Sequence, residues 1–215
     1  MDKKILITGT GIISAMGRNT REVAMNLYEG KCGLHHDEWR VSYNSDLCGN
    51  VYSYEKNYQD VLTHAQYECM PLHGFYVLEA VFEALKKAKV SKDFLESHNV
   101  SLIVSNDSEC WESRHVVNHV NDGDSNDTLP VTTLFRSLNS TISMNLASIL
   151  HIHGLSLTVS AACAGGGHAI GLAKMLLDSK QTEMVIVIGA QETTTEYCME
   201  AFDALGVFSP DRVQP

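Results

Sequence analysis

The segment LSLTVSAACAGGGHAIGLAKMLLDSK, residues 155–180, decides the fold of this chain. Residues 155–160 form a short run of aliphatic and β-branched side chains, which is typical of a strand. Apolar residues recur at helical spacing over residues 169–177 and predict a helix. Between the two patterns lie Cys163 and a series of alanines and glycines. The sequence therefore predicts that Cys163 lies where a strand turns sharply into the N-terminus of a helix.

A cysteine in that place is suited to nucleophilic chemistry. Unpaired backbone N–H groups and the positive end of the helix dipole favour a thiolate over a thiol. The same N–H groups can hold the oxyanion that develops when the sulfur attacks a thioester. Small neighbours permit a strained turn and leave room for a long substrate. The alternative interpretation is a buried structural cysteine beside a flexible glycine loop.

The start of the predicted helix carries two further expectations. Three consecutive glycines, residues 165–167, each cost about 1 kcal/mol relative to alanine in a helix, so we expect a steric reason for them. His168 follows Cys163 by five residues, which places it about 140° around the helix axis. We therefore expect His168 to pack or to cap the helix, and not to act as the base for Cys163.

The rest of the chain alternates between strand and helix patterns. The expected elements are a strand over residues 3–9, a helix over residues 20–30 with Thr20 as N-cap, an irregular surface excursion over residues 32–66, a helix over residues 72–89, a strand over residues 100–105 and a helix over residues 131–150. No internal repeat or proline-rich linker interrupts the pattern. We therefore predict one compact α/β unit over residues 1–215.

Composition excludes several classes of protein. The chain is 44% hydrophobic and 20% charged, which is ordinary for a globular protein, and no apolar run is long enough to cross a bilayer. The N-terminus has no apolar leader, so we expect a cytoplasmic protein. A formal charge of −10 disfavours nucleic-acid binding and is awkward for an acidic partner. The six cysteines include no C-x-x-C pair, so we expect free thiols, five of them packed as small hydrophobes.

Two segments imitate known ligand sites. Gly9 and Gly11 begin like a dinucleotide-binding loop, but the third glycine position is occupied by Ser14 and no acidic residue follows in a clear second strand. Residues 121–127 are acidic like a calcium loop, but they lack the glycine at the sixth position and the acidic residue at the twelfth. We therefore expect no metal site and no cofactor.

Several motifs together resemble the bacterial β-ketoacyl-[acyl carrier protein] synthases of types I and II, within the thiolase-like superfamily. The matching motifs, in chain order, are ITGTGIISAMG at residues 7–17, GKCGL at residues 30–34, VSAACA at residues 159–164, IGAQE at residues 188–192 and FDALGVFS at residues 202–209. The resemblance implies a thiolase-like α/β fold with a mixed central sheet flanked by helices. It also implies that Cys163 accepts an acyl chain, which a carbanion from decarboxylating malonyl-ACP then extends.

The resemblance assigns expectations to three further residues. Phe202 matches a position that lines the acyl pocket, with a plain core residue as the alternative. Ser108 lies in the segment 105–110, which replaces a glycine-rich run that shapes the far end of that pocket. Arg136 matches a basic position used to dock the acyl carrier protein, with a plain surface arginine as the alternative. Glu68, by contrast, stands where an arginine commonly helps that docking.

The resemblance covers only the N-terminal half of the family. Its two catalytic histidines and a lysine lie in the second half, and none of the ten histidines here stands at a matching position. We therefore expect residues 1–215 to be a fragment that lacks the C-terminal half and does not complete condensation alone, because nothing stabilises the malonyl-derived enolate.

Two other interpretations share the same fold. A chain-length-factor-like subunit would partner an active ketosynthase, but such subunits characteristically lack the nucleophilic cysteine. Another thiolase-like acyltransferase would differ in its second half. The expected partners are acyl carrier protein and either a second copy of the chain or a ketosynthase subunit, with dimerisation through residues 155–160; no nucleic acid or membrane is expected.

Overall fold

The computed structural model describes residues 4–40, 45–51, 58, 60–107, 110–193 and 195–211. Where the sequence predicted one unit, the structure divides into two. The first unit comprises residues 1–11 and 56–191, and the second comprises residues 12–55 and 192–215. The elements of the first unit are α2 (His64–Cys69), α3 (Leu72–Ala88), α4 (Lys92–Ser97), β3 (Val100–Asn106), α5 (Cys110–Asn121), η2 (Asn126–Thr128), α6 (Thr133–Arg136), α7 (Thr141–Leu150), β4 (Ser156–Val159), η3 (Ala162–Ala164), α8 (Gly165–Asp178) and β5 (Met184–Ala190).

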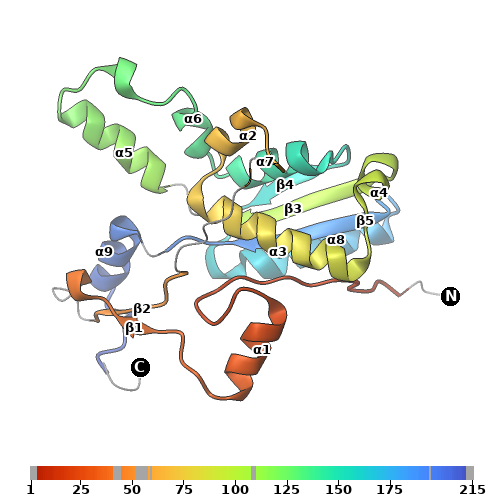
Figure 1. Cartoon of the computed structure of the whole chain (residues 1–215), viewed down its shortest axis with the longest axis horizontal. Coiled ribbons are helices and arrows are strands. Elements are labelled where there is room, and N and C mark those ends of the chain that lie inside the picture. Colours follow the sequence, from red (N-terminus) through yellow and green to blue (C-terminus); the bar gives the residue numbers. More distant parts are fainter. Residues whose placement is uncertain are drawn as a thin grey trace. The chain divides into compact units, whose positions relative to one another are not determined.

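A parallel sheet forms the centre of the first unit. Its strand order is β4-β3-β5, and both neighbours run parallel to β3. Helix α8 covers one face of the sheet, and α3 and α7 cover the other (Figure 1). Parallel strands joined by helices are the α/β arrangement that the alternating sequence pattern predicted.

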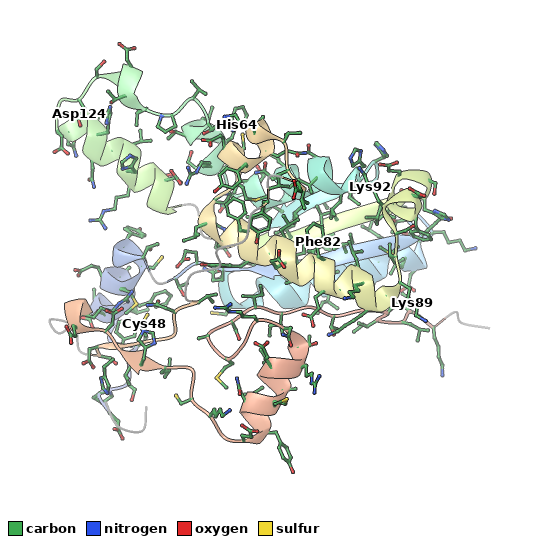
Figure 2. The ribbon with its side chains drawn as sticks, in the orientation of Figure 1. Cys48, His64, Phe82, Lys89, Lys92 and Asp124 are labelled. Atoms are coloured by element: carbon green, nitrogen blue, oxygen red, sulfur yellow. The ribbon has the colours of Figure 1, made fainter. Side chains whose placement is uncertain are left out.

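The central strand β3 is buried along its whole length and alternates between the two cores. Val100, Leu102 and Val104 belong to the larger core, which includes Phe82 and other apolar residues of α3 and α7 (Figure 2). Ile103 belongs to the smaller core, with Ala169 and Ala173 of α8. Because side chains alternate across a strand, the odd-numbered residues of β3 face α8.

Most of the predicted helices are confirmed, with corrections at their ends. The helix predicted over residues 72–89 is α3, and its C-cap Lys89 has the left-handed conformation. The helix predicted from residue 20 is α1 (Thr20–Tyr28), but its N-cap is Asn19, whose side chain accepts from the backbone N–H of Glu22. The single helix predicted over residues 131–150 is wrong, since residues 137–140 separate α6 from α7.

The predicted N-terminal strand is also wrong. Residues 4–9 pair with no described strand, and Leu6 and Ile7 are exposed. The segment runs instead along α3, where a methyl group on Gly11 would lie 2.7 Å from the carbonyl carbon of Ala80. A β-branched run favours a strand, but it becomes one only where a neighbouring strand offers its backbone.

The second unit contains α1, β1 (His35–His36), η1 (Glu38–Arg40), β2 (Leu47–Cys48) and α9 (Glu196–Ala204). Strands β1 and β2 pair antiparallel, with His35 opposite Cys48. The excursion predicted over residues 32–66 thus holds two very short strands, and the described residues 60–66 belong to the first unit. None of the described helices combines the length and the hydropathy needed to span a membrane.

Candidate active site

The strand-to-helix turn lies where the sequence predicted it. Strand β4 ends at Val159, a short 3-10 turn spans Ala162–Ala164, and α8 begins at Gly165. Ala162 has a backbone φ of +46°, a left-handed conformation that is disfavoured for a residue with a Cβ atom. Cys163 is exposed. The interpretation of Cys163 as a buried structural cysteine is therefore wrong.

The turn leaves one backbone donor beside the sulfur. The N–H of Ala164 donates to the carbonyl of Ala161, and the N–H of Gly165 donates to the carbonyl of Ala162. The N–H of Ala162 donates to the carboxylate of Asp107 at 3.1 Å. Within the part of the chain that the structure describes, the N–H of Cys163 has no acceptor. It can therefore hold an oxyanion formed next to the Cys163 sulfur.

Packing explains only one of the three consecutive glycines. At Gly165 a methyl group would overlap the hydroxyl of Ser105 and lie 3.2 Å from its Cβ atom. At Gly166, Gly167 and also Gly171 nothing in the structure lies within 4 Å of such a methyl group. The expected steric reason is confirmed for Gly165 alone. The sequence did not show which of the three glycines is sterically required.

Asp107 is the residue at this site that the sequence interpretation missed. It follows β3 directly, and it accepts hydrogen bonds from the hydroxyl of Ser160 and from the N–H of Ala162. No local pattern near residue 107 signals this contact, because it depends on the register of the parallel pair, in which Ser105 lies opposite Val159. Two residues further along each strand, Asp107 falls level with the turn.

A shallow hollow of about 480 Å³ lies between the end of β4 and the exposed side of α8. Its lining is mostly apolar and includes Val159, Gly171 and Met175. His168 also lines this hollow and is exposed, so the expectation that it packs or caps the helix is wrong. Gly167 and Gly171 of the same helix also line the hollow.

The other predicted site residues lie away from this turn along the chain. Arg136 forms an ion pair with Glu112 of α5, and its side chain is 31% exposed. Phe202 lies on α9 in the second unit and is 42% exposed, so it is not a core residue of that unit. Ser108 lies outside the described residues. Their roles in docking and in the acyl pocket remain predictions.

The cysteines differ in exposure. Among the cysteines whose side chains the structure describes, Cys48 and Cys198 are buried, Cys69 is half-buried, and Cys32 and Cys163 are exposed; these five are free thiols, and the side chain of Cys110 lies outside the described part. Cys48 lies in β2 (Figure 2), and burial raises the pKa of its thiol above the ordinary value of 9.0. The expectation that every other cysteine packs as a hydrophobe is therefore wrong for Cys32. The described residues contain no group of three or more side chains placed to hold a metal ion.

A parallel sheet flanked by helices, whose edge strand among the described strands turns sharply through an exposed cysteine into a helix, defines an α/β protein. The family model for the β-ketoacyl synthase N-terminal domain matches residues 2–215, and the chain belongs to this family. The thiolase-like α/β fold that the motifs implied is thereby confirmed, although the three strands described at its centre all run parallel.

Curated relatives agree with this assignment. The chain is 27% identical over 218 residues to 3-oxoacyl-[acyl-carrier-protein] synthase 1 of Buchnera aphidicola subsp. Acyrthosiphon pisum, covering 96% of this chain and 51% of that protein. It is 23% identical to nodulation protein E of Rhizobium leguminosarum bv. trifolii, covering 100% and 53%. The chain thus spans about half the length of the curated relatives it matches.

Solved structures share the fold at lower identity. The ishigamide ketosynthase/chain length factor superposes with a TM-score of 0.83 at 20% identity, covering 97% of this chain and 52% of that one. A β-ketoacyl synthase from Burkholderia phymatum gives a TM-score of 0.81 at 20% identity, with the same coverage.

Proposed function

We propose that Cys163 is the nucleophile of a β-ketoacyl-[acyl carrier protein] synthase. The observation that carries the proposal is the exposed thiol at a helix start, beside a backbone N–H that has no acceptor among the described residues. Such a sulfur combines access with a partial positive field, the two conditions that favour a reactive thiolate. Membership of the family supports the same reaction class.

The first half-reaction is acyl transfer to the cysteine. The Cys163 thiolate attacks the thioester carbonyl of an acyl carrier protein, and the carbonyl oxygen gains negative charge. The N–H of Cys163 donates to that oxygen. The carbon–sulfur bond to the carrier then breaks, the carrier leaves as a thiolate that takes up a proton, and the acyl group stays on Cys163.

The second half-reaction extends the chain. Malonyl-ACP loses carbon dioxide, and the electron pair of the broken carbon–carbon bond becomes a carbanion. That carbanion attacks the acyl carbonyl, and the Cys163 sulfur departs with its electron pair. Stabilising the enolate requires donors that the family carries in its second half, so we assign condensation to the whole protein and only acyl transfer to the residues described here.

A non-catalytic chain-length-factor-like subunit is the second candidate. The similarity to the ishigamide ketosynthase/chain length factor supports this candidate through the fold alone. Such subunits characteristically lack the nucleophilic cysteine, so the exposed Cys163 favours a synthase. Another thiolase-like acyltransferase would use the same cysteine with a different second half.

Acyl carrier protein and a second subunit are the proposed partners, and the cytoplasm is the proposed compartment. A type II PKS acyl-carrier protein in complex with its ketosynthase is a further solved structure that shares the fold, with a TM-score of 0.79. Strand β4 is an edge of the described sheet, and the side chains of Leu157, in this strand, and of Leu155, directly before it, are exposed. An exposed apolar edge of this kind favours pairing with a second copy or a ketosynthase partner through residues 155–160.

Acylation by a carrier-bound acyl chain tests the proposed function. We expect the full-length protein to gain the mass of one acyl group when it is incubated with acyl-ACP, and peptide mapping to place that mass on Cys163. Cys163→Ser should gain none, whereas Cys32→Ser, which removes the other exposed thiol, should gain the full mass. An acyl group that maps elsewhere, or that persists in Cys163→Ser, contradicts the assignment.

A further inference from the structure

The carboxylate of Asp107 fastens the turn that carries Cys163. One oxygen accepts from the hydroxyl of Ser160, and the other accepts from the N–H of Ala162 at 3.1 Å. These donors flank Ala161, so a single side chain holds both ends of the bend between β4 and η3. Both bonds join residues more than fifty positions apart in the chain.

The position of Asp107 directly after the central strand β3 places its carboxylate next to the turn. Odd-numbered residues of β3 face α8, as Ile103 and Ser105 do. Asp107 continues that alternation one step beyond the strand, on the face that holds the start of α8. In the register that pairs Ser105 with Val159, the position level with Asp107 is Ala161.

The backbone at the turn needs such support. Ala162 has a φ of +46°, where its Cβ atom crowds the backbone. Glycine adopts this conformation freely, but the chain carries alanine here. A hydrogen bond from the Ala162 N–H to a charged acceptor is stronger than one to a neutral group, so Asp107 favours the left-handed conformation over its relaxed alternatives.

We propose that Asp107 is a positioning residue for the acyl transfer. By holding Ala162 in the left-handed conformation, it keeps the sulfur and the N–H of Cys163 turned together toward an incoming thioester. The carboxylate also occupies the Ala162 N–H, which leaves the N–H of Cys163 as the donor for the oxyanion. This inference rests on the proposed function of Cys163 as the nucleophile.

A double-variant cycle on the full-length protein tests the inference. Asp107→Ala removes both hydrogen bonds, and Ala162→Gly lets the backbone adopt its positive φ without them. The readouts are the maximal single-turnover rate of Cys163 acylation, the acyl-ACP concentration at half that rate, and the rate of Cys163 alkylation by iodoacetamide. Asp178→Ala is the control, because it removes an exposed carboxylate at the far end of α8.

We expect Asp107→Ala to lower the maximal acylation rate about tenfold or more, since it deletes hydrogen bonds to a charged acceptor. The half-saturating concentration should stay within about threefold, because a positioning residue acts on the geometry of the reacting atoms and not on binding of the carrier. Adding Ala162→Gly should recover most of the rate. Asp107→Asn should give an intermediate rate, since the amide keeps one acceptor oxygen but loses the negative charge and the second acceptor oxygen.

Two results overturn the inference. One is an Asp107→Ala variant that acylates and alkylates like the wild type. The other is a folded Asp107→Ala/Ala162→Gly variant that stays as slow as Asp107→Ala, which shows that Asp107 does not act through the Ala162 backbone. If Asp107→Ala fails to fold, the acylation rates of Asp107→Asn and Asp107→Asn/Ala162→Gly are compared in its place.

Failure of the proposed function gives a different result. If wild-type Cys163 accepts no acyl group, the nucleophile assignment fails. The alkylation rates of Cys163 across the same variants then still decide whether Asp107 positions the turn.

Discussion

Ser105 and Gly165 meet at the start of α8 with no room for a further carbon atom between them. The Ser105 hydroxyl lies where a side chain at position 165 would begin, and the Cβ atom of Ser105 would be 3.2 Å from it. Ser105 belongs to the central strand and is buried. This contact sets how closely the helix that follows Cys163 approaches the sheet.

Gly165→Ala should therefore destabilise the protein by about 1–3 kcal/mol, the usual effect of overpacking a buried contact. Urea unfolding measures it. Gly171→Ala is the matched control: it lies inside the same helix with open space around it, so it should stabilise by up to about 1 kcal/mol. Ser105→Ala should recover most of the loss in Gly165→Ala. Equal effects at positions 165 and 171 would contradict the packing argument.

Iodoacetamide should alkylate Cys163 faster than any other cysteine at neutral pH. Cys32 is the matched comparison, because it is also exposed but lies in a loop of the second unit. Activation by the helix start predicts faster labelling of Cys163 than of Cys32, whereas exposure alone predicts similar rates. Cys48 and Cys198 are buried and should react last. Time-resolved peptide mapping distinguishes these outcomes.

Carrier binding should depend on the pair formed by Arg136 and Glu112. If Arg136 docks an acidic carrier protein, Arg136→Ala should weaken binding by roughly 1 kcal/mol or less, as for an exposed ion pair. Glu112→Gln should tighten it, because the carboxylate that now pairs with Arg136 is removed. Arg21→Ala, at an exposed arginine of α1, is the control. The affinity of each variant for acyl carrier protein is measured by titration at low and high salt. Unchanged affinities in the Arg136 and Glu112 variants would show that Arg136 is a plain surface arginine.

The buried thiol of Cys48 should make the protein less stable in alkali. Burial raises the pKa of Cys48 above its ordinary value of 9.0, so the folded state disfavours the thiolate that the unfolded chain forms. The contribution of the protonated Cys48 thiol to the free energy of unfolding is fully present below pH 9. It declines as the pH rises toward the pKa of Cys48 in the folded state. Urea unfolding across this pH range should show that the free energy of unfolding falls less steeply with pH for Cys48→Ala than for the wild type. Cys32→Ala, at an exposed thiol, should leave the slope unchanged.

Local sequence patterns predicted much of the fold. Apolar spacing located α3 within one residue at its C-terminal end, and the aliphatic run at residues 100–105 located β3. The strand, the small residues and the helix around Cys163 were each recognisable because their side chains alternate or repeat over a few residues. The split between α6 and α7 was missed, since no glycine or proline marks residues 137–140.

The predictions that failed depend on contacts between residues that are distant in the chain. The run at residues 4–9 looked like a strand, but strand formation depends on a neighbouring backbone that the segment does not contain. Asp107 appeared only as a departure from a glycine-rich run. Its hydrogen bonds to Ser160 and Ala162 depend on the pairing of β3 with β4, which the local pattern near residue 107 does not specify.

The sequence by itself determined that Cys163 follows a strand and precedes a helix, because backbone propensity and side-chain periodicity are properties of neighbouring residues. Only the tertiary structure decided that this thiol is exposed, that Gly165 must lack a side chain and that Asp107 reaches the turn. Each of those facts depends on the alignment of one parallel strand against another. A shift of that register by one residue would turn Asp107 away from the turn.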